Sequence, residues 1–238
     1  MLDDVTGVAT HIIAATALTA IRTAGGSTLA TQHLLPSTFT PKTVTVFAAG
    51  NQSYHHLTHL LYAYPTISHI NVVNRSAPRM TMMLQDLRAA TSPADFTSTE
   101  ILLASAAGII TAVATSDIIV LATNSSTPLF TGADLPADKT IHIIGVGSYT
   151  PSMVEIDATT LAKCATVVVD THGALTVGDL AQSETTKNDV VTLEELLREE
   201  KKERPPNQIT FFKSVGVASQ DIAAAGYVID QLEKQPSP

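Results

Sequence analysis

The sequence predicts an α/β fold built on a doubly wound parallel sheet, and three observations support it. Short runs rich in Val and Ile alternate with stretches of helical periodicity along most of the 238 residues. The runs are continuously apolar, as strands of a parallel sheet covered on both faces require. A turn of small residues, from Ala48 to Ser53, follows the first run and precedes a helix, which is where folds of this class bind phosphate groups.

Six buried strands are expected from the Val and Ile runs, and the helices between them make right-handed crossovers. The expected strands are Thr43 to Phe47, His69 to Asn74, Glu100 to Ala104, Asp117 to Ala122, Thr140 to Val146 and Ala165 to Asp170. The expected helices among them are Gln52 to Tyr64, Pro78 to Ala90, Ala106 to Ala114 and Ala158 to Lys163.

A further helix is expected ahead of this block, from Leu18 to Leu34. Gly25 and Gly26 lie in its middle, and each costs about 1 kcal/mol relative to Ala in a helix interior. We therefore expect tight packing at these two glycines.

The last part of the chain predicts three more elements. The charged segment from Leu193 to Arg204 predicts a solvated helix without chemistry, ended by Pro205 and Pro206. A short strand is expected from Ile209 to Phe212. A final helix is expected from Val217 to Leu232.

Composition excludes several classes of protein. The chain has 14 Lys and Arg against 22 Asp and Glu, a formal net charge of −8, which excludes a general nucleic-acid binder. Its one cysteine, Cys164, leaves no internal disulfide and no cysteine zinc site, and we expect no metal. The longest apolar run, Ile101 to Ala114, is shorter than the ~20 residues that cross a bilayer. Asp3 and Asp4 stand where targeting peptides carry basic residues, so we expect a cytoplasmic protein without a membrane or nucleic-acid partner.

The turn after the first strand is the expected phosphate site. Dinucleotide folds use Gly-x-Gly-x-x-Gly/Ala here, whereas this chain has Ala48-x-Gly50-x-x-Ser53 and keeps the glycine that lets the backbone approach the phosphates. A slightly wider loop would absorb the methyl group of Ala48, and Ser53 is small and offers a hydroxyl. With Asn51 and Gln52 these residues form the expected cofactor-binding loop. An ordinary small-residue turn is an equally good interpretation of the loop alone.

The end of the second strand indicates which dinucleotide binds. An NAD enzyme normally places a carboxylate there for the ribose 2′-hydroxyl, but this chain has Asn74, Arg75 and Ser76. An arginine makes charge-assisted bonds to a 2′-phosphate, and the two neutral side chains add hydrogen bonds. We therefore expect NADP(H) to be preferred, with NAD(H) as the alternative. Arg79, one helical turn on, is either a further contact or a surface arginine.

Several segments together resemble the ornithine cyclodeaminase and mu-crystallin family, which includes ketimine reductases and related NAD(P)-dependent enzymes of amino-acid metabolism. The similarity covers nearly the whole chain, in the family's order and at compatible spacings. The matching segments are LTAIRTA (18–24), VTVFAAGNQS (44–53), INVVNRS (70–76), DIIVLATNS (117–125), IGVGSYTPSMVEID (144–157) and FFKSVGVASQD (211–221).

The resemblance implies two domains with the active site in the cleft between them. A Rossmann-type NAD(P)-binding domain is expected over residues 23–207. The substrate and dimerisation domain is expected to be split between residues 1–22 and the strand and helix of residues 208–238. Family chains normally begin well upstream of the position of Met1, so we expect this second domain to be residual. Either the chain is a truncated product, or a homodimer partner or another chain completes the site.

The resemblance also implies roles for single residues. Arg22 matches the arginine that binds the substrate carboxylate, a role suited to the guanidinium fork, and its alternative is a helix-surface arginine. Thr23 matches a threonine that contacts cofactor phosphate. Thr123 and Asn124 are expected to line the cofactor just past the fourth strand.

The segment FFKSVGVASQD is expected to lie at the reacting end of the cofactor. The resemblance implies that the backbone of Ser214, Val215 and Gly216 approaches the nicotinamide and the substrate. Lys213 has a surface lysine as its alternative. Asp221 has a helix-start residue as its alternative.

One departure from the family bears on the reaction. Family members that cyclise ornithine carry an acid/base aspartate in the loop after the fifth strand, where this chain has Tyr149. The replacement favours an imine reductase over a lyase. Tyr149 is a candidate proton donor, with packing as the alternative. Glu155 and Asp157 match the family motif, yet starting the next helix explains them equally well.

Three functions follow from these observations. The first is an NADPH-dependent oxidoreductase that reduces the C=N bond of a small imino acid, with a related amino acid as the other substrate of the reaction. The second is a catalytically impaired NADP-binding protein or an oligomer-forming truncated paralogue. The third is a lyase of the ornithine cyclodeaminase type.

Overall fold

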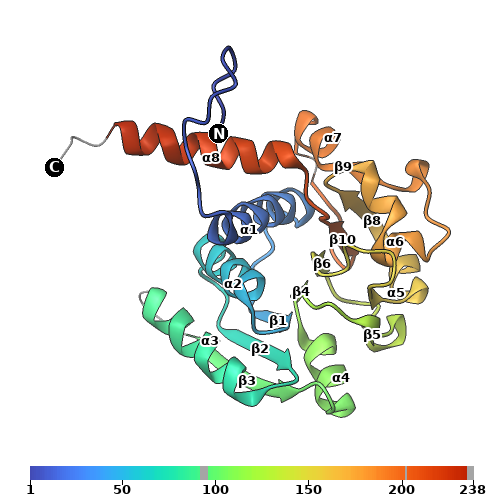
Figure 1. Cartoon of the computed structure of the whole chain (residues 1–238). Helices are drawn as coiled ribbons and strands as arrows, with labels where there is room; N and C mark the ends of the chain where they lie inside the picture. Colours follow the sequence, from blue (N-terminus) through green and yellow to red (C-terminus); the bar gives the residue numbers. More distant parts are fainter. Residues whose placement is uncertain (92–95, 202, 235–238) are drawn as a thin grey trace.

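An eight-stranded sheet runs through the centre of the computed structural model, which describes residues 1–91, 96–201 and 203–234 (Figure 1). Its strands are parallel and lie in the order β3-β2-β1-β4-β6-β10-β8-β9. They are β1 (Thr43–Phe47), β2 (His69–Asn74), β3 (Thr97–Leu102), β4 (Ile118–Leu121), β6 (Ile141–Gly145), β8 (Cys164–Val169), β9 (Val191–Thr192) and β10 (Ile209–Lys213). The chain leaves β1 for β2 and β3 and then returns to β4 on the other side of β1. This order confirms the predicted doubly wound α/β fold.

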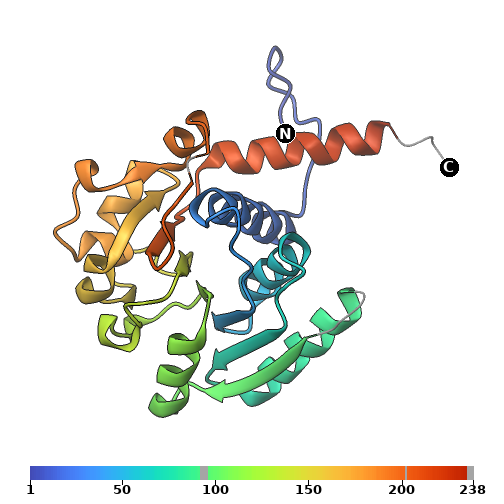
Figure 2. The same cartoon turned by 180° about the vertical axis from the view of Figure 1, so that it is seen from behind.

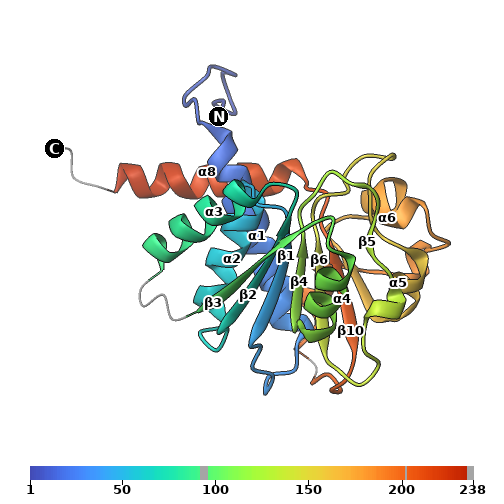
Figure 3. The same ribbon diagram turned by 90° about the horizontal axis from the view of Figure 1, so that it is seen from below.

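Apolar side chains cover both faces of the sheet, as the continuous Val and Ile runs predict. One face packs against α1 (Ala15–Leu34), α2 (Asn51–Ala63), α3 (Ala77–Ala90) and α7 (Leu193–Arg198). The other packs against α4 (Ala106–Thr115), α5 (Ala158–Ala162) and α6 (Gly178–Ala181), so that the sheet lies between two helical layers (Figure 3). The remaining helices are α8 (Ala218–Glu233) and the 3-10 turns η1 (Gly132–Asp134), η2 (His172–Thr176) and η3 (Lys187–Asp189).

The prediction of six buried strands is wrong for the third. This strand, β3, begins at Thr97 rather than Glu100, and within it Ile101 is the buried side chain. It lies at the edge of the sheet and pairs with β2. Polar residues extend it at its start through backbone pairing, which a search for apolar runs does not detect.

The charged helix expected from Leu193 to Arg204 is shorter than predicted. It ends at Arg198 as α7, and Lys202 lies outside the described residues. Leu193 and Leu196 are buried against the core, so the segment is not solvated on all sides. Beyond Arg198 the sequence offers no apolar face that would hold another turn against the sheet.

Two further features differ from the prediction. A second, two-stranded parallel sheet of β5 (Ser126–Phe130) and β7 (Val154–Ile156) was not expected, because β5 is polar and exposed except near its end. The tight packing expected at the two glycines of α1 is not found. A Cβ on Gly25 would meet no described atom within 4 Å, and one on Gly26 would meet Gln220 Nε2 at 4.0 Å.

The first residues of the chain and α8 lie on the same side of the molecule (Figures 1 and 2). α8 packs against α1 near its own start and then extends away from the sheet, where Ile222 and Tyr227 are exposed. The domain boundary expected after residue 22 falls inside α1, which is one continuous helix. The division into domains stays a prediction, and its residues 235–238 lie outside the described part of the chain. None of the described helices is long and apolar enough to span a membrane.

Candidate functional site

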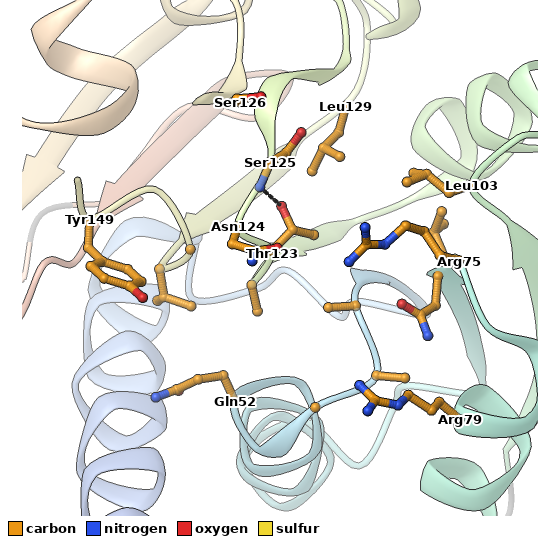
Figure 4. A pocket seen from close by; sticks show the side chains of 18 residues that line it. Gln52, Arg75, Arg79, Leu103, Thr123, Asn124, Ser125, Ser126, Leu129 and Tyr149 are labelled. Carbon is orange, nitrogen blue, oxygen red and sulfur yellow. Dashed lines mark hydrogen bonds between the residues drawn. The ribbon is translucent and has the colours of Figure 1, made fainter. Parts of the chain in front are cut away.

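A pocket of about 570 Å³ opens at the carboxyl ends of the central strands (Figure 4). It lies where the chain turns back from β3 to β4 beside β1, the switch point at which doubly wound sheets bind ligands. Loops that follow β1, β2, β3, β4 and β6 form its walls. The lining residues are Ala48, Ala49, Gly50, Gln52, Val73, Asn74, Arg75, Arg79, Leu103, Ala122, Thr123, Asn124, Ser125, Ser126, Leu129, Val146, Gly147 and Tyr149.

The turn after β1 has the geometry of a phosphate site. Ala48 adopts φ 96°, in the left-handed region that favours glycine, at the position where dinucleotide folds have their first glycine. Gly50 caps α2, and no side chain in the described part of the protein bonds to the first free N–H groups of the helix. Gln52 Oε1 and Ser53 Oγ are buried and have no hydrogen-bond partner among the described residues. The N–H groups of the helix start and the Ser53 hydroxyl are donors, as the pyrophosphate of a dinucleotide requires.

One residue of the predicted loop lies elsewhere. Asn51 does not line this pocket, but a neighbouring groove between α1, α2 and α3. Its side chain is exposed.

Two arginines line the end of the pocket beside β2. The guanidinium groups of Arg75 and Arg79 both point into it (Figure 4), and no carboxylate is among the lining residues. Asn74 also lines the pocket, and its Nδ2 donates to the carbonyl oxygen of Ser76 at 3.2 Å, which fixes the turn before α3. Ser76 caps α3 and is not a lining residue. This end of the pocket is therefore positively charged.

A smaller pocket of about 200 Å³ adjoins the first. It is lined by Thr19, Arg22, Thr23, Gln52, Val146, Tyr149, Ser214, Val215 and Gly216. The two pockets share Gln52, Val146 and Tyr149. Residues far apart in the sequence, from α1, the loop after β6 and the loop after β10, thus meet where the two pockets join.

Arg22 is already engaged by a carboxylate of the chain itself. Its Nε donates to Asp221 Oδ1 at 2.9 Å, its Nη2 to Asp221 Oδ2 at 3.4 Å, and its Nη1 to Gln220 Oε1 at 2.9 Å. Gly216 adopts φ 83° beside it, and a Cβ there would lie 3.1 Å from Nη2. Asp221 therefore does more than start α8, and Arg22 is not a helix-surface arginine, since its side chain is 12% exposed.

The side chain of Thr23 is held by a hydrogen bond, whereas that of Tyr149 is largely exposed. The Thr23 hydroxyl donates to the carbonyl oxygen of Thr19 at 2.7 Å within α1. Tyr149 is 57% exposed, and it lies across the pocket from the two arginines (Figure 4).

The surface alternative for Lys213 is wrong, because the side chain is fully buried. Its Nζ donates to Asp179 Oδ2 at 3.1 Å and to the hydroxyl of Ser148, which in turn bonds to Asp179. The side chains of Lys213 and Asp179 are both 0% exposed. The buried ion pair therefore ties α6 to β10, and the Ser148 hydroxyl joins the loop after β6 to both partners.

The helix-start interpretation holds for Asp157 and is wrong for Glu155. Asp157 caps α5 by accepting from the N–H of Thr160. The Glu155 carboxylate instead accepts hydrogen bonds from the loops after β4 and β6, including one from the N–H of Thr123 at 2.7 Å. Burial raises the pKa of Glu155 to about 7, opposed by the charge of Lys213.

Two positioning carboxylates were missed by the sequence reasoning. Asp170 Oδ2 accepts from Ser214 Oγ at 2.8 Å and from the N–H groups of Val215 and Gly216 at 2.9 and 2.7 Å. Its place at the end of a predicted strand was a usable signal. Asp179, in a short helix after a loop, gave none. Among the described residues no group of His, Cys, Asp and Glu could hold a metal ion.

The chain is similar to a known family and to curated members of it over almost its whole length. The family model described as "Ornithine cyclodeaminase/mu-crystallin family" matches residues 1–236. A Delta(1)-pyrroline-2-carboxylate reductase of Bacillus cereus is 30% identical over 97% of this chain and 70% of that protein.

Two solved structures are similar along the whole fold. A probable ornithine cyclodeaminase from Bordetella pertussis Tohama I has a TM-score of 0.82 at 26% identity, over 100% of this chain and 74% of that one. The Thermococcus litoralis Delta(1)-pyrroline-2-carboxylate reductase, in complex with NADH and L-proline, has a TM-score of 0.82 at 23% identity, over 96% of this chain and 69% of that one. At 23% identity, the similarity to the Thermococcus litoralis protein supports the fold alone.

Proposed function

We propose that this chain, which belongs to the ornithine cyclodeaminase/mu-crystallin family, is an NAD(P)-dependent oxidoreductase that reduces the C=N bond of a small imino acid. One observation carries the proposal. A long pocket with a free helix N-terminus joins a small pocket that contains Arg22, at the shared residues Gln52, Val146 and Tyr149. The resemblance to a pyrroline-2-carboxylate reductase supports a cyclic ketimine as substrate.

The cofactor would be held along the long pocket. The pyrophosphate would lie on the loop formed by Ala48, Gly50, Asn51, Gln52 and Ser53, because uncapped N–H groups and the helix dipole favour an anion there. When bound, the nicotinamide supplies the hydride for the imine carbon. It would lie at the other end of the pocket, where Thr123, Asn124 and the backbone of residues 214–216 surround the junction of the two pockets. Thr23 is the proposed contact to cofactor phosphate from α1.

We propose a preference for NADPH over NADH. Arg75 and Arg79 project into the pocket beside β2, with Asn74 next to them, and no carboxylate lines that end. Two guanidinium groups favour a 2′-phosphate, because each makes charge-assisted hydrogen bonds to phosphate oxygens. Ser76 would contribute through its backbone to the shape of the turn.

The substrate carboxylate would bind Arg22. The guanidinium is positioned for a bidentate carboxylate, since Asp221 already pairs with it. Substrate binding therefore requires the Asp221 carboxylate to share or leave the guanidinium. Tyr149 is the side chain at the junction that can donate a proton to the imine nitrogen.

A non-catalytic NADP-binding protein is the second candidate. The Arg22–Asp221 pair favours it, because the guanidinium needed for substrate is already neutralised. The lyase is disfavoured, because the chain has Tyr149 where the lyases of the family are expected to carry an aspartate.

Titration with NADPH and NADH, followed by nicotinamide fluorescence, tests the cofactor site. Turnover of Δ1-pyrroline-2-carboxylate then tests the reaction. The expected result is binding of both cofactors, tighter for NADPH, with turnover that is lost in Arg22→Ala while cofactor binding remains. Cofactor binding without turnover would favour the binding protein, and no binding of either cofactor would defeat both candidates.

We also propose an oligomeric state and a cellular location for the chain. We propose that residues 1–22 and 208–238 belong to a substrate and dimerisation unit, and that the chain works as a homodimer or with another chain. Sedimentation equilibrium checks this directly. The expected cytoplasmic location follows from cysteine usage in the sequence.

A further inference from the structure

We propose that Glu155 is a positioning residue of the cofactor site. Its carboxylate joins the loop after β4 to the loop after β6 and sets the separation of these two pocket walls. The inference rests on the proposed function, because it assigns to Glu155 a part in binding the proposed cofactor.

The carboxylate divides its two oxygens between the two loops. Oε1 accepts from the N–H and the hydroxyl of Thr123, each at 2.7 Å. Oε2 accepts from the N–H groups of Gly147 and Ser148, at 3.0 and 3.1 Å. Thr123 and Gly147 both line the cofactor pocket, whereas Glu155 itself does not. Glu155 is therefore placed to act on the cofactor through its neighbours.

The two loops approach too closely for any side chain to separate them. A Cβ on Gly147 would lie 2.0 Å from the carbonyl oxygen of Thr123 and 2.5 Å from Glu155 Oε1. Glycine is thus required at this position for steric reasons. The hydrogen bonds of Glu155 hold the two backbones in direct contact.

Asp179 and Lys213, behind Glu155, hold its backbone in place. Asp179 Oδ1 accepts from the N–H groups of Glu155 and Ile156, at 2.6 and 3.1 Å. Asp179 Oδ2 pairs with Lys213 Nζ at 3.1 Å. All three charged side chains are buried. The carboxylate of Glu155 therefore has little freedom to follow the loops if they move apart.

The ionised form of Glu155 is the form that can hold both loops. Three of the four groups that bond to its oxygens are backbone N–H donors, so a proton added to Oε2 would place an O–H against N–H groups alone. The charged groups that face Glu155 are Lys213 from β10 and Asp179 from α6. Burial raises the pKa of the Glu155 carboxyl to about 7, which brings this loss into an accessible pH range.

Glu155→Gln tests the proposal by cofactor titration. A glutamine presents one acceptor oxygen and one NH₂ donor group, so the loop that meets the NH₂ group loses the hydrogen bonds of its N–H groups. We expect the Kd for NADPH and for NADH to rise about tenfold or more, with binding stoichiometry unchanged. A merely structural role would instead lower the fraction of competent protein and leave Kd as it is.

Asp157→Asn is the matched control. Asp157 lies two residues on in the same motif and also accepts backbone N–H bonds, from Gly132 at 3.2 Å and Thr160 at 2.8 Å. Neither partner lines the pocket. The Kd of this variant should equal that of the wild type.

The outcomes separate this inference from the proposed function. If the wild type binds neither cofactor, the proposed function fails. If the wild type binds and Glu155→Gln binds with the same Kd, the proposed function stands and the role of Glu155 is overturned. If the variant does not fold, the pH dependence of cofactor binding by the wild type tests the role of Glu155 instead. Its Kd for NADH, which lacks the titrating 2′-phosphate, should rise as the pH falls through about 7, and a flat profile overturns the inference.

Discussion

The two halves of the site differ in whether their polar and charged groups are already bonded within the chain. In the half around β1 and β2, polar groups are left free: the first N–H groups of α2 have no side-chain cap, and Arg75 and Arg79 point into the pocket. In the half around β6, β8 and β10, the carboxylates are already bonded to the chain's own backbone or to Lys213. They are those of Glu155, Asp170 and Asp179.

The contrast follows from what each half has to bind. An anionic ligand brings its own partners for free N–H groups and arginines, so these can stay unsatisfied until it arrives. Loops that only need a fixed shape have no such partner, and buried backbone groups in them must be bonded internally. Ligand-binding electrostatics and preorganisation are thus separated in space, on either side of the switch point.

The largest expected effect comes from breaking the buried ion pair of the second half. Asp179→Asn leaves Lys213 without its ion-pair partner at a site where both side chains are 0% exposed. Removing one partner of a buried pair typically costs about 3–5 kcal/mol of the free energy of unfolding. Urea denaturation measures the loss. The double variant with Lys213→Met should recover part of it, and a double variant as unstable as the single one would contradict this account.

The second largest effect is expected from acid, which should lower the free energy of unfolding through His56 in the first half. His56 is fully buried between α1 and α2, with its Nδ1 2.7 Å from the carbonyl oxygen of Gln52 and its Nε2 2.9 Å from Ser27 Oγ. Burial lowers the pKa of His56 from 6.5 to about 4. The unfolded chain therefore binds a proton in this range that the folded chain does not, and stability falls as the pH drops from 6.5 toward 4.

The size of that loss is on the order of 3 kcal/mol for His56. Urea denaturation at a series of pH values checks it, and His56→Gln should flatten part of the slope. His142 is buried in the second half, where its pKa is lowered to about 3, so its contribution should persist in the variant. An unchanged slope in His56→Gln would show that other groups dominate.

The arginines of the first half should affect cofactor choice more than stability. Arg75→Ala should raise the Kd for NADPH by roughly 10- to 100-fold, the worth of a hydrogen bond to a charged group, and change that for NADH little. Arg88→Ala is the control, because Arg88 lies on α3, the helix that follows Arg75, and stacks on Phe96 without lining the pocket. Equal effects of Arg75→Ala on both cofactors would refute the 2′-phosphate contact.

The sequence predicted the first half far better than the second. Free donors, arginines and the turn around Gly50 all lie within a few residues of a strand end, so local pattern and spacing found them. The network of Glu155, Asp179 and Lys213 joins segments up to 58 residues apart, since 213 − 155 = 58. No local pattern distinguishes a buried lysine from a surface one, and the alternative for Lys213 could not be resolved without the fold. Likewise, β3 and β5 carry polar residues, and their pairing depends on the neighbouring strands.

The smallest expected effect is a gain in stability at the phosphate turn. Ala48 holds φ 96°, where its Cβ is strained, while its N–H donates to the carbonyl oxygen of Val73 at 2.8 Å and keeps the turn in place. Ala48→Gly should therefore raise the free energy of unfolding by about 1 kcal/mol. Ala49→Gly is the matched control. Ala49 is not among the residues with positive φ, so added chain entropy should lower stability by roughly 0.5–1 kcal/mol. Urea denaturation of both variants compares them. A loss in Ala48→Gly would mean that the methyl group, beside the partly buried Ala49 at the edge of the core, contributes more than its strain costs.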